Sequence, residues 1–312
     1  MEVLDFMAQR VREMLNATVT DFSYSGLDFI QDDCPSLIVS NHRDIVLDAS
    51  LLEYMLFLNG RNTTQVLAGE NLLKNPKMAH FCQMNKVFSI ERGNGSKRAF
   101  YESLLKVSNH IRKAITEDHE SVWIAQRNGR TKNGLDHTEA SLIKMFSRSS
   151  KLPAMESLEE LHIIPMSISY EFESCDYLKA RELYLSQSGT YHKSANEDMN
   201  SIQTGVEQFK GRVHLTLGEP LSHGELVKAN DSGDLFHNVA AILDRRIWRG
   251  YKLWPNNYIA HDMRAGKQEY KDYYTSEEVE VFEAHLAKAE EIYRSWLLDI
   301  YANPIENYIK IC

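Results

Sequence analysis

The sequence has few of the features that mark several common classes of protein. Its 312 residues include only 4 cysteines: Cys34, Cys82, Cys175 and Cys312. They lie far apart with no Cys-x-x-Cys spacing, so we expect reduced thiols in a cytoplasmic protein and neither a disulfide framework nor a zinc ribbon. No apolar run approaches the roughly 18 to 20 residues needed to cross a bilayer. The N-terminal stretch also lacks the charged-then-apolar layout of a signal peptide.

An excess of basic residues is also missing. The chain has 35 Lys and Arg against 44 Asp and Glu, a formal net charge of −9, which argues against nucleic acid as a partner. Five histidines have no partner at metal-ligand spacing, so no metal is expected: His110, His119, His137, His162 and His214. Hydrophobic residues make up 43% of the chain, enough for a sizeable core.

Short apolar runs alternate with amphipathic stretches, which is typical of an α/β fold with a mostly covered sheet flanked by helices. We expect strands within 36–40, 65–69, 86–91, 121–126, 161–172 and 212–221. Helices are expected between them, the first running to about Leu58. The change in character after these elements suggests an α/β domain at 1–250 and a helical C-terminal extension at 251–312.

Amphipathic helices are predicted at both ends of the chain. At the N-terminus, Val3, Phe6, Met7, Val11, Met14 and Leu15 recur at helical spacing, so this helix either docks on the core or rests on a membrane surface. From Thr275 to Ile300 the pattern predicts one long helix, with Thr275 and Glu278 as its capping box. Its apolar stripe is expected to pack on the α/β body or on a second subunit.

The stretch SNHRDIVLD, from Ser40 to Asp48, contains the His-Arg-Asp string of protein kinases. A kinase would carry Asn where this chain has Ala49. It would also need a glycine-rich loop and a β3 lysine within the 41 residues before His42, and an Asp-Phe-Gly motif after the His-Arg-Asp string. None of these is present, so the kinase interpretation fails.

His42 instead follows a predicted buried strand, at the end where α/β folds often carry chemistry. A carboxylate beside such a histidine can accept the Nδ1 proton and orient the ring as a general base. Asp44 and Asp48 are both candidates for this carboxylate, because they straddle the start of the next helix. The alternative is that His42 closes a turn and the aspartates cap the helix.

Together with SNHRDIVLD, three later segments make the chain similar to the glycerolipid (lysophospholipid) acyltransferase superfamily, whose first motif is Asn-His-x4-Asp after a strand. The second block resembles KVFSIERG, with Arg92 in the place of the family's arginine. WIAQRNGRTKNG (123–134) resembles the Phe-Pro-Glu-Gly-Thr-Arg-Ser turn, and HIIPMSISYE (162–171) resembles the fourth block, with Pro165. The four blocks occur in the family's order over residues 36–171.

Three positions depart from the family pattern. Five residues separate His42 from Asp48 where the family has four, so either an insertion moves the acid to Asp48, which we favour, or Asp44 serves instead. Asn128 occupies the place of the glutamate of the third block, and Lys86 or its neighbour replaces the glycine of the second.

The resemblance implies transfer of a fatty acyl group from acyl-CoA or acyl carrier protein to a hydroxyl of a glycerol phosphate or lysophospholipid, with no bound cofactor. It implies that His42 is the general base and Asp48 its acid. The substrate-binding candidates are Arg92, Arg127, Arg130 and Lys132 for the phosphate, Gly129 for close backbone approach, and Pro165 for the acyl pocket. Such an enzyme would be cytoplasmic, with peripheral contact at the inner face of the membrane as an option.

Two other functions stay open. The chain could be a catalytically impaired member of this fold that binds lipid or a partner, as the changed spacing and Asn128 suggest. It could also acylate a different acceptor, such as an aminolipid headgroup or a secondary metabolite, with the same base and a changed phosphate site.

Overall fold

The computed structural model describes residues 2–69, 86–90, 97–189, 191–194 and 196–311. Within these residues, strands form one sheet in the order β1-β7-β6-β2-β5-β3-β4. The strands are β1 (Val19–Ser25), β2 (Leu37–Ser40), β3 (Gln65–Gly69), β4 (Val87–Ile90), β5 (Val122–Ala125), β6 (Ile164–Tyr170) and β7 (Gly211–Leu217). Neighbouring strands are parallel except β6 and β7. The mixed α/β sheet predicted from the sequence is therefore confirmed.

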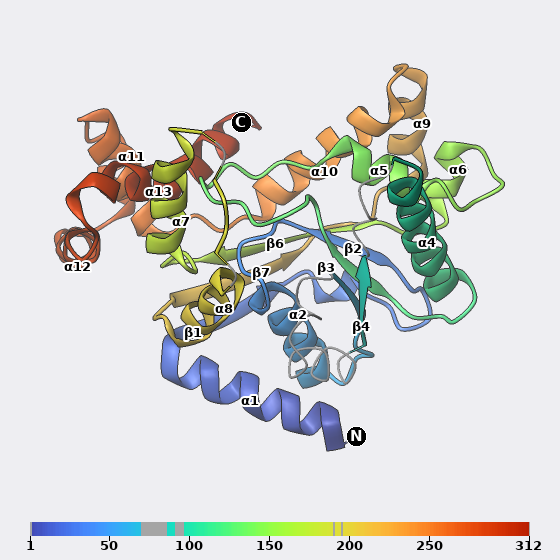
Figure 1. Ribbon diagram of the computed structural model, residues 1–312, viewed down its shortest axis with the longest axis horizontal. Helices are drawn as coiled ribbons and strands as arrows, with labels where there is room; N and C mark the ends of the chain where they lie inside the picture. Colours follow the sequence, from blue (N-terminus) through green and yellow to red (C-terminus); the bar gives the residue numbers. More distant parts are fainter. Residues whose placement is uncertain (1, 70–85, 91–96, 190, 195, 312) are drawn as a thin grey trace.

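Helices cover both faces of the sheet (Figure 1). One face carries α1 (Glu2–Thr18) and α2 (Leu47–Leu58). The other carries α4 (Lys97–Thr116), α5 (Ala140–Phe146), α6 (Ala154–Glu159), α9 (His223–Asp231) and α10 (Leu235–Gly250). The remaining helices are α7 (Asp176–Ser186), α8 (Glu197–Glu207), α11 (Pro255–Ala265), α12 (Ser276–Ala287) and α13 (Arg294–Ile309), with short 3₁₀ turns at Leu27–Phe29, Lys271–Tyr273 and Glu291–Tyr293.

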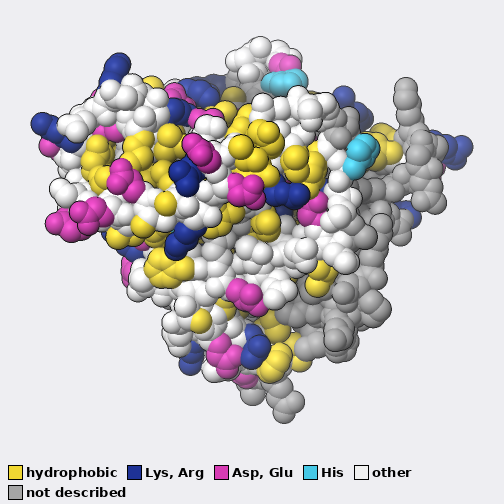
Figure 2. All heavy atoms as spheres, turned by 60° about the vertical axis from the view of Figure 1, so that its left-hand side comes forward, with side chains coloured by type: hydrophobic (Ala, Val, Ile, Leu, Met, Phe, Trp, Pro, Cys, Tyr) yellow, Lys and Arg dark blue, Asp and Glu magenta, His cyan; other side chains and the backbone are white. Residues whose placement is uncertain are grey.

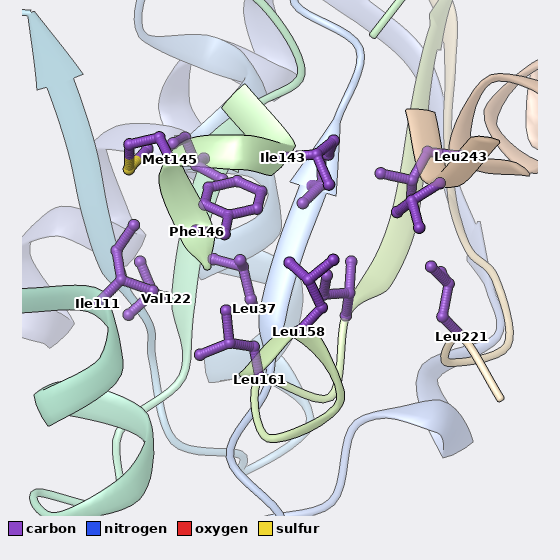
Figure 3. Packing of buried hydrophobic residues seen from close by; sticks show 14 of the residues in the cluster. Leu37, Ile111, Val122, Ile143, Met145, Phe146, Leu158, Leu161, Leu221 and Leu243 are labelled. Atoms are coloured by element: carbon purple, nitrogen blue, oxygen red, sulfur yellow. The ribbon is translucent and has the colours of Figure 1, made fainter. Parts of the chain in front are cut away.

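The central strand β2 is apolar throughout because both of its faces are covered. Leu37 and Val39 point into the core under α4, α5 and α10, part of which is shown in Figure 3, whereas Ile38 points into the core under α2. All three side chains are fully buried. A strand covered on both faces cannot alternate between apolar and polar residues, which is why SLIVS appears in the sequence as a continuous apolar run.

Strand β1 was not predicted. It lies at the edge of the sheet, where β7 is its one neighbour among the described strands, and its side chains are all at least partly exposed. An edge strand with one neighbour tolerates polar residues such as those of VTDFSYS, so its sequence carries little hydrophobic pattern.

The predicted N-terminal helix is present as α1, and its two halves differ. Met14 and Leu15 are buried against the core, whereas Val3 and Phe6 in the first half are 38% and 57% exposed. The helix therefore docks on the core through Ala8, Met14 and Leu15, while the apolar side chains of its first turns stay exposed.

The single long helix predicted from Thr275 to Ile300 is wrong. The chain forms α12, a 3₁₀ turn at Glu291–Tyr293 and then α13, although the capping box of Thr275 and Glu278 is present as predicted. Carbonyls near the break accept from the Arg294 guanidinium, whose Nε lies 3.2 Å from the Ala289 oxygen. The break lets apolar residues of both helices enter one core with α7 and α11, which outweighs the helical preference of the local sequence.

These C-terminal helices form a third hydrophobic core that also contains Ala180 of α7. On the face that carries them, hydrophobic side chains lie among acidic and basic ones (Figure 2). Gly134, in the loop after β5, packs directly on α13, where a Cβ would overlap the carbonyl oxygen of Ile300. The division of the chain at residue 250 stays a prediction.

Replacing Gly134 with Ala should destabilise the protein by more than backbone strain alone. Gly134 and Gly60 both have left-handed backbones, with φ of +79° and +65°, but only Gly134 has atoms in the path of a Cβ. We expect Gly60→Ala to cost about 1 to 2 kcal/mol and Gly134→Ala about 2 kcal/mol more. Urea unfolding of the two variants measures the difference, and equal losses would contradict the close packing of this loop on α13.

Candidate active site

The carboxyl ends of three parallel strands meet at one edge of the sheet. Strand β2 lies between β5 and β6, with Ser40 opposite both Ala125 and Met166. The segment after β2 therefore lies beside the segments that follow β5 and β6. In open α/β sheets this edge is the usual place for ligands and chemistry.

His42 and Asp48 form a pair at this edge. Nδ1 of His42 lies 3.0 Å from Oδ2 of Asp48. The Asp48 side chain is fully buried, and that of His42 is 15% exposed. With Nδ1 bonded to a carboxylate, the ring can take a proton at Nε2, which is the arrangement a general base requires.

Three further donors hold the Asp48 carboxylate. Oδ2 also accepts from the backbone N–H groups of Arg43 and Asp44, at 2.7 and 2.9 Å. Oδ1 accepts from the hydroxyl of Tyr170, at 3.0 Å. Burial and the nearby Asp48 charge raise the pKa of Tyr170 well above its ordinary value, so this phenol stays a donor. Asp48 therefore fixes both the histidine ring and the turn that carries it.

Asp44, the alternative acid, lies in the same turn with other partners. Its Oδ1 accepts from the backbone N–H groups of Val46 and Leu47, both at 2.9 Å, and its Oδ2 accepts from the Ser174 hydroxyl. Asp44 thus satisfies two backbone N–H groups where the chain enters α2. The geometry pairs His42 with Asp48, and the catalytic role of that pair stays a prediction.

Asn41, the first residue of the motif, joins β2 to β6. Its side-chain oxygen accepts from the Ile168 N–H at 2.8 Å, and its Nδ2 donates to the Ile168 carbonyl at 3.0 Å. An asparagine amide can make both bonds at once, which continues the sheet pairing for one more residue. His42 consequently leaves the sheet at a defined point.

The loop after β5 closes over the other side of the turn. Thr131 donates its backbone N–H to the carbonyl of His42 at 2.7 Å. Arg130 is 9% exposed, and its Nη1 is a buried atom without a hydrogen-bond partner among the described residues. The same holds for Gln126 Nε2 and Thr131 Oγ1. Unpaired buried polar atoms are costly, so this cluster beside His42 suits a polar ligand.

Two other predicted phosphate ligands, Lys132 and Arg127, already contact protein side chains. Lys132 donates to Glu182, and Arg127 Nη1 lies 3.3 Å from Nδ1 of His137. Burial and then the Arg127 charge lower the pKa of His137. Gly129 has φ of +76° and open space where a Cβ would lie, consistent with close approach of a ligand to its backbone.

The remaining substrate-binding candidates from the sequence are Arg92 and Pro165. Arg92 lies outside the described residues. Pro165 is the second residue of β6, opposite Val39 of β2, and its carbonyl accepts from the N–H of Gly218 at 2.8 Å. Near a strand start, proline loses little by lacking an N–H. Its contact with an acyl chain stays a prediction.

Sequence reasoning missed a buried ionic cluster next to His42. Arg43 is 1% exposed, with Nη2 2.6 Å from Asp136 and Nη1 3.3 Å from Glu173. Burial disfavours its charge, but the two carboxylates outweigh this and raise the pKa of Arg43 well above its ordinary value. Lys179 lies 2.5 Å from the same Glu173. Arg43 is part of the His-Arg-Asp string, but its partners Asp136 and Glu173 lie 93 and 130 residues further along the chain. No local sequence pattern marks them as its partners.

No group of three or more His, Cys, Asp and Glu side chains in the described part of the chain is placed to hold a metal ion. None of the helices in that part is long and apolar enough to cross a membrane.

Removing the Arg43 guanidinium should destabilise the protein strongly. In Arg43→Met two buried carboxylates lose their shared cation, which typically costs about 3 to 5 kcal/mol. The matched control is Arg10→Met, whose ion pair with Glu13 is exposed on α1 and should cost less than about 1 kcal/mol. Chemical denaturation measures both. Similar small losses would mean that Arg43 is not needed to neutralise the cluster.

Residues 21–169 match the model of the Acyltransferase family. The chain is also similar to the crystal structure of the 1-acyl-sn-glycerophosphate (LPA) acyltransferase, PlsC, from Thermotoga maritima, with 14% identity, a TM-score of 0.43 and 76% of each chain covered. None of the curated proteins compared with the sequence matches it. The matched region contains His42, Asp48, Arg130 and Pro165 in their motif order, and this match supports the acyltransferase superfamily that these motifs resemble.

Proposed function

We propose that the protein transfers a fatty acyl group from acyl-CoA or acyl carrier protein to a hydroxyl of a glycerol phosphate or lysophospholipid. The observation that carries this proposal is the His42–Asp48 pair, 3.0 Å apart at the carboxyl edge of the sheet, within the region that matches the acyltransferase family. The thioester is a co-substrate, and the reaction needs no resident cofactor.

His42 acts as the general base. The acceptor hydroxyl loses its proton to Nε2 as its oxygen attacks the thioester carbonyl, because an unactivated alcohol is a poor nucleophile. Asp48 stabilises the imidazolium that forms. The tetrahedral intermediate then collapses, the C–S bond breaks, and the leaving thiolate takes the proton from His42. The products are the ester and the free thiol, so neither a redox step nor an enzyme nucleophile is required.

Arg130 is the strongest candidate among the described residues for binding the acceptor phosphate. It is almost buried, Nη1 has no hydrogen-bond partner within the described part of the chain, and the next residue, Thr131, is hydrogen-bonded to His42. A guanidinium suits a phosphate because it can donate two parallel hydrogen bonds. Arg127 and Lys132 already contact His137 and Glu182 and would contribute charge at longer range. Arg92 remains a candidate from its motif position alone.

Peripheral contact with a membrane is part of the proposal, because the acyl acceptor or its product is a lipid. The exposed apolar side chains in the first half of α1, Val3 and Phe6, support contact from one side.

A different acyl acceptor is the second candidate function. Asn128 stands where the family has glutamate, and this change affects the loop that carries Arg130. The ordered His42–Asp48 pair favours either enzymatic function over a catalytically impaired lipid-binding protein, because a binding protein has no need of an oriented base.

The His42 mechanism predicts a large loss of acyl transfer in two variants. His42→Ala and Asp48→Asn should each lower acceptor-dependent thiol release by about 100-fold or more, since general-base catalysis typically contributes this much. The control is His223→Ala, which removes an exposed histidine that also pairs with a carboxylate, Glu159 at 2.8 Å, and should leave the rate unchanged. Thiol release in folded His42→Ala equal to that of the wild type would exclude His42 as the base.

The acceptor is identified with a panel assay. Glycerol 3-phosphate, lysophosphatidic acid and a non-phosphorylated alcohol are each tested with acyl-CoA and acyl carrier protein donors. Arg130→Gln should raise the KM for a phosphorylated acceptor about tenfold or more, because a charge-assisted bond is lost, while the donor KM stays within twofold. Acylation of only the non-phosphorylated alcohol would favour the second candidate function.

A further inference from the structure

We propose that Lys179, on the first turn of α7, positions the turn that carries His42, and that the C-terminal helices hold Lys179 in place. The inference deepens the proposed function and rests on it for the kinetic part of its test. It concerns residues beyond the region that matches the acyltransferase family, residues 21–169.

Lys179 contacts the backbone of the residue that follows His42. Its Nζ donates to the carbonyl oxygen of Arg43 at 2.7 Å and to Glu173 Oε1 at 2.5 Å. Lys179 is 1% exposed, so these bonds form away from water. Lysine has the reach and the charge for such a contact, but burying an ammonium group is costly, and a paired carboxylate offsets that cost only in part.

The Arg43 backbone is thereby fixed on both sides. Its N–H donates to Asp48 Oδ2 at 2.7 Å, and its carbonyl accepts from Lys179. The Arg43 side chain is bonded to Asp136 and to the second oxygen of Glu173. The carbonyl of His42 itself is bonded to Thr131. The carbonyl of His42, the N–H of Arg43 and the carbonyl of Arg43 thus each have a specific partner. The direction in which the imidazole of His42 points therefore depends on these partners.

Tyr301 of α13 connects this arrangement to the C-terminal helices. Its hydroxyl accepts from the backbone N–H of Glu173 at 3.0 Å and donates to Asp176 Oδ2 at 2.6 Å. Nε2 of His285, in α12, lies 2.6 Å from the same Asp176 oxygen. Residues 173–176 lead from β6 into α7, so α12 and α13 determine where α7 begins and where Lys179 lies.

The loss of Lys179 should therefore impair the chemical step more than substrate binding. The Arg43 carbonyl would be left without its buried donor, and the turn would sample positions in which His42 Nε2 misses the acceptor hydroxyl. Displacement of a catalytic group by about 1 Å can lower the rate about 100-fold. The phosphate candidate Arg130 belongs to the loop after β5 and takes no part in the bonds of Lys179 to Arg43 and Glu173.

The test compares four variants at a temperature at which circular dichroism shows each to be folded. Lys179→Met removes the donor and keeps the volume. Glu173→Gln with Lys179→Met removes one charge of each sign, so that the buried cluster around Arg43 stays balanced and does not misfold because of an excess carboxylate. Lys179→Arg keeps a buried donor. The matched control is Arg112→Met, because Arg112 also donates to buried backbone carbonyls, those of Phe146 and Ser157, but lies between α4, α5 and α6.

We expect kcat to fall about tenfold or more in Lys179→Met and in the double variant, with both KM values within twofold, and to recover in part in Lys179→Arg. Arg112→Met should keep the wild-type kcat. Unchanged kcat in the folded double variant, or a raised KM with unchanged kcat, would overturn the positioning role.

Hydrogen exchange separates this inference from the proposed function, because it needs no activity. The backbone amides of Arg43 and Asp44 should exchange about tenfold faster in Lys179→Met than in the wild type, whereas Arg112→Met should leave them unchanged. A wild type without acyl transfer would refute the proposed function alone. Unchanged exchange at Arg43 and Asp44 in Lys179→Met would refute the positioning role, whatever the activity.

Discussion

The buried carboxylate of Asp48 is the interaction on which the rest of the site depends. It accepts hydrogen bonds from one imidazole, two backbone N–H groups and one phenol, with no exposure to solvent. A charge can stay buried only when its oxygens are satisfied in this way. The donors come from the turn after β2 and from Tyr170 at the end of β6, so satisfying Asp48 also sets how the two strand ends meet.

The ionic cluster around Arg43 also holds the turn after β2 in place, through residues that follow β5 and β6. Arg43 joins Asp136, which follows β5, to Glu173, which follows β6, and Lys179 adds a second cation from α7. Buried ion pairs contribute little net stability compared with apolar packing. Their directional hydrogen bonds, however, place backbone atoms in a way that apolar contacts do not. The proposed base therefore lies on a turn whose geometry is determined by three segments at once.

Local patterns in the sequence predicted much of the fold because their causes are local. The apolar run SLIVS is continuous because β2 is covered on both faces, and the capping box at Thr275 and Glu278 needs only residues three apart. Prediction failed where distant contacts decide the outcome. The break between α12 and α13 is set by a core shared with α7 and α11, and β1 is polar because it lies at an edge.

For the candidate site, the sequence by itself determined the His-x5-Asp pattern after a strand and the order of the family motifs. Only the tertiary structure decided between Asp44 and Asp48, because both lie in one turn and their partners differ: Ser174 and the start of α2 for Asp44, His42 and Tyr170 for Asp48. It likewise placed Arg43 and Lys179 in the interior. Burial and pairing of charges are properties of the assembled sheet edge, where segments more than a hundred residues apart in sequence come into contact.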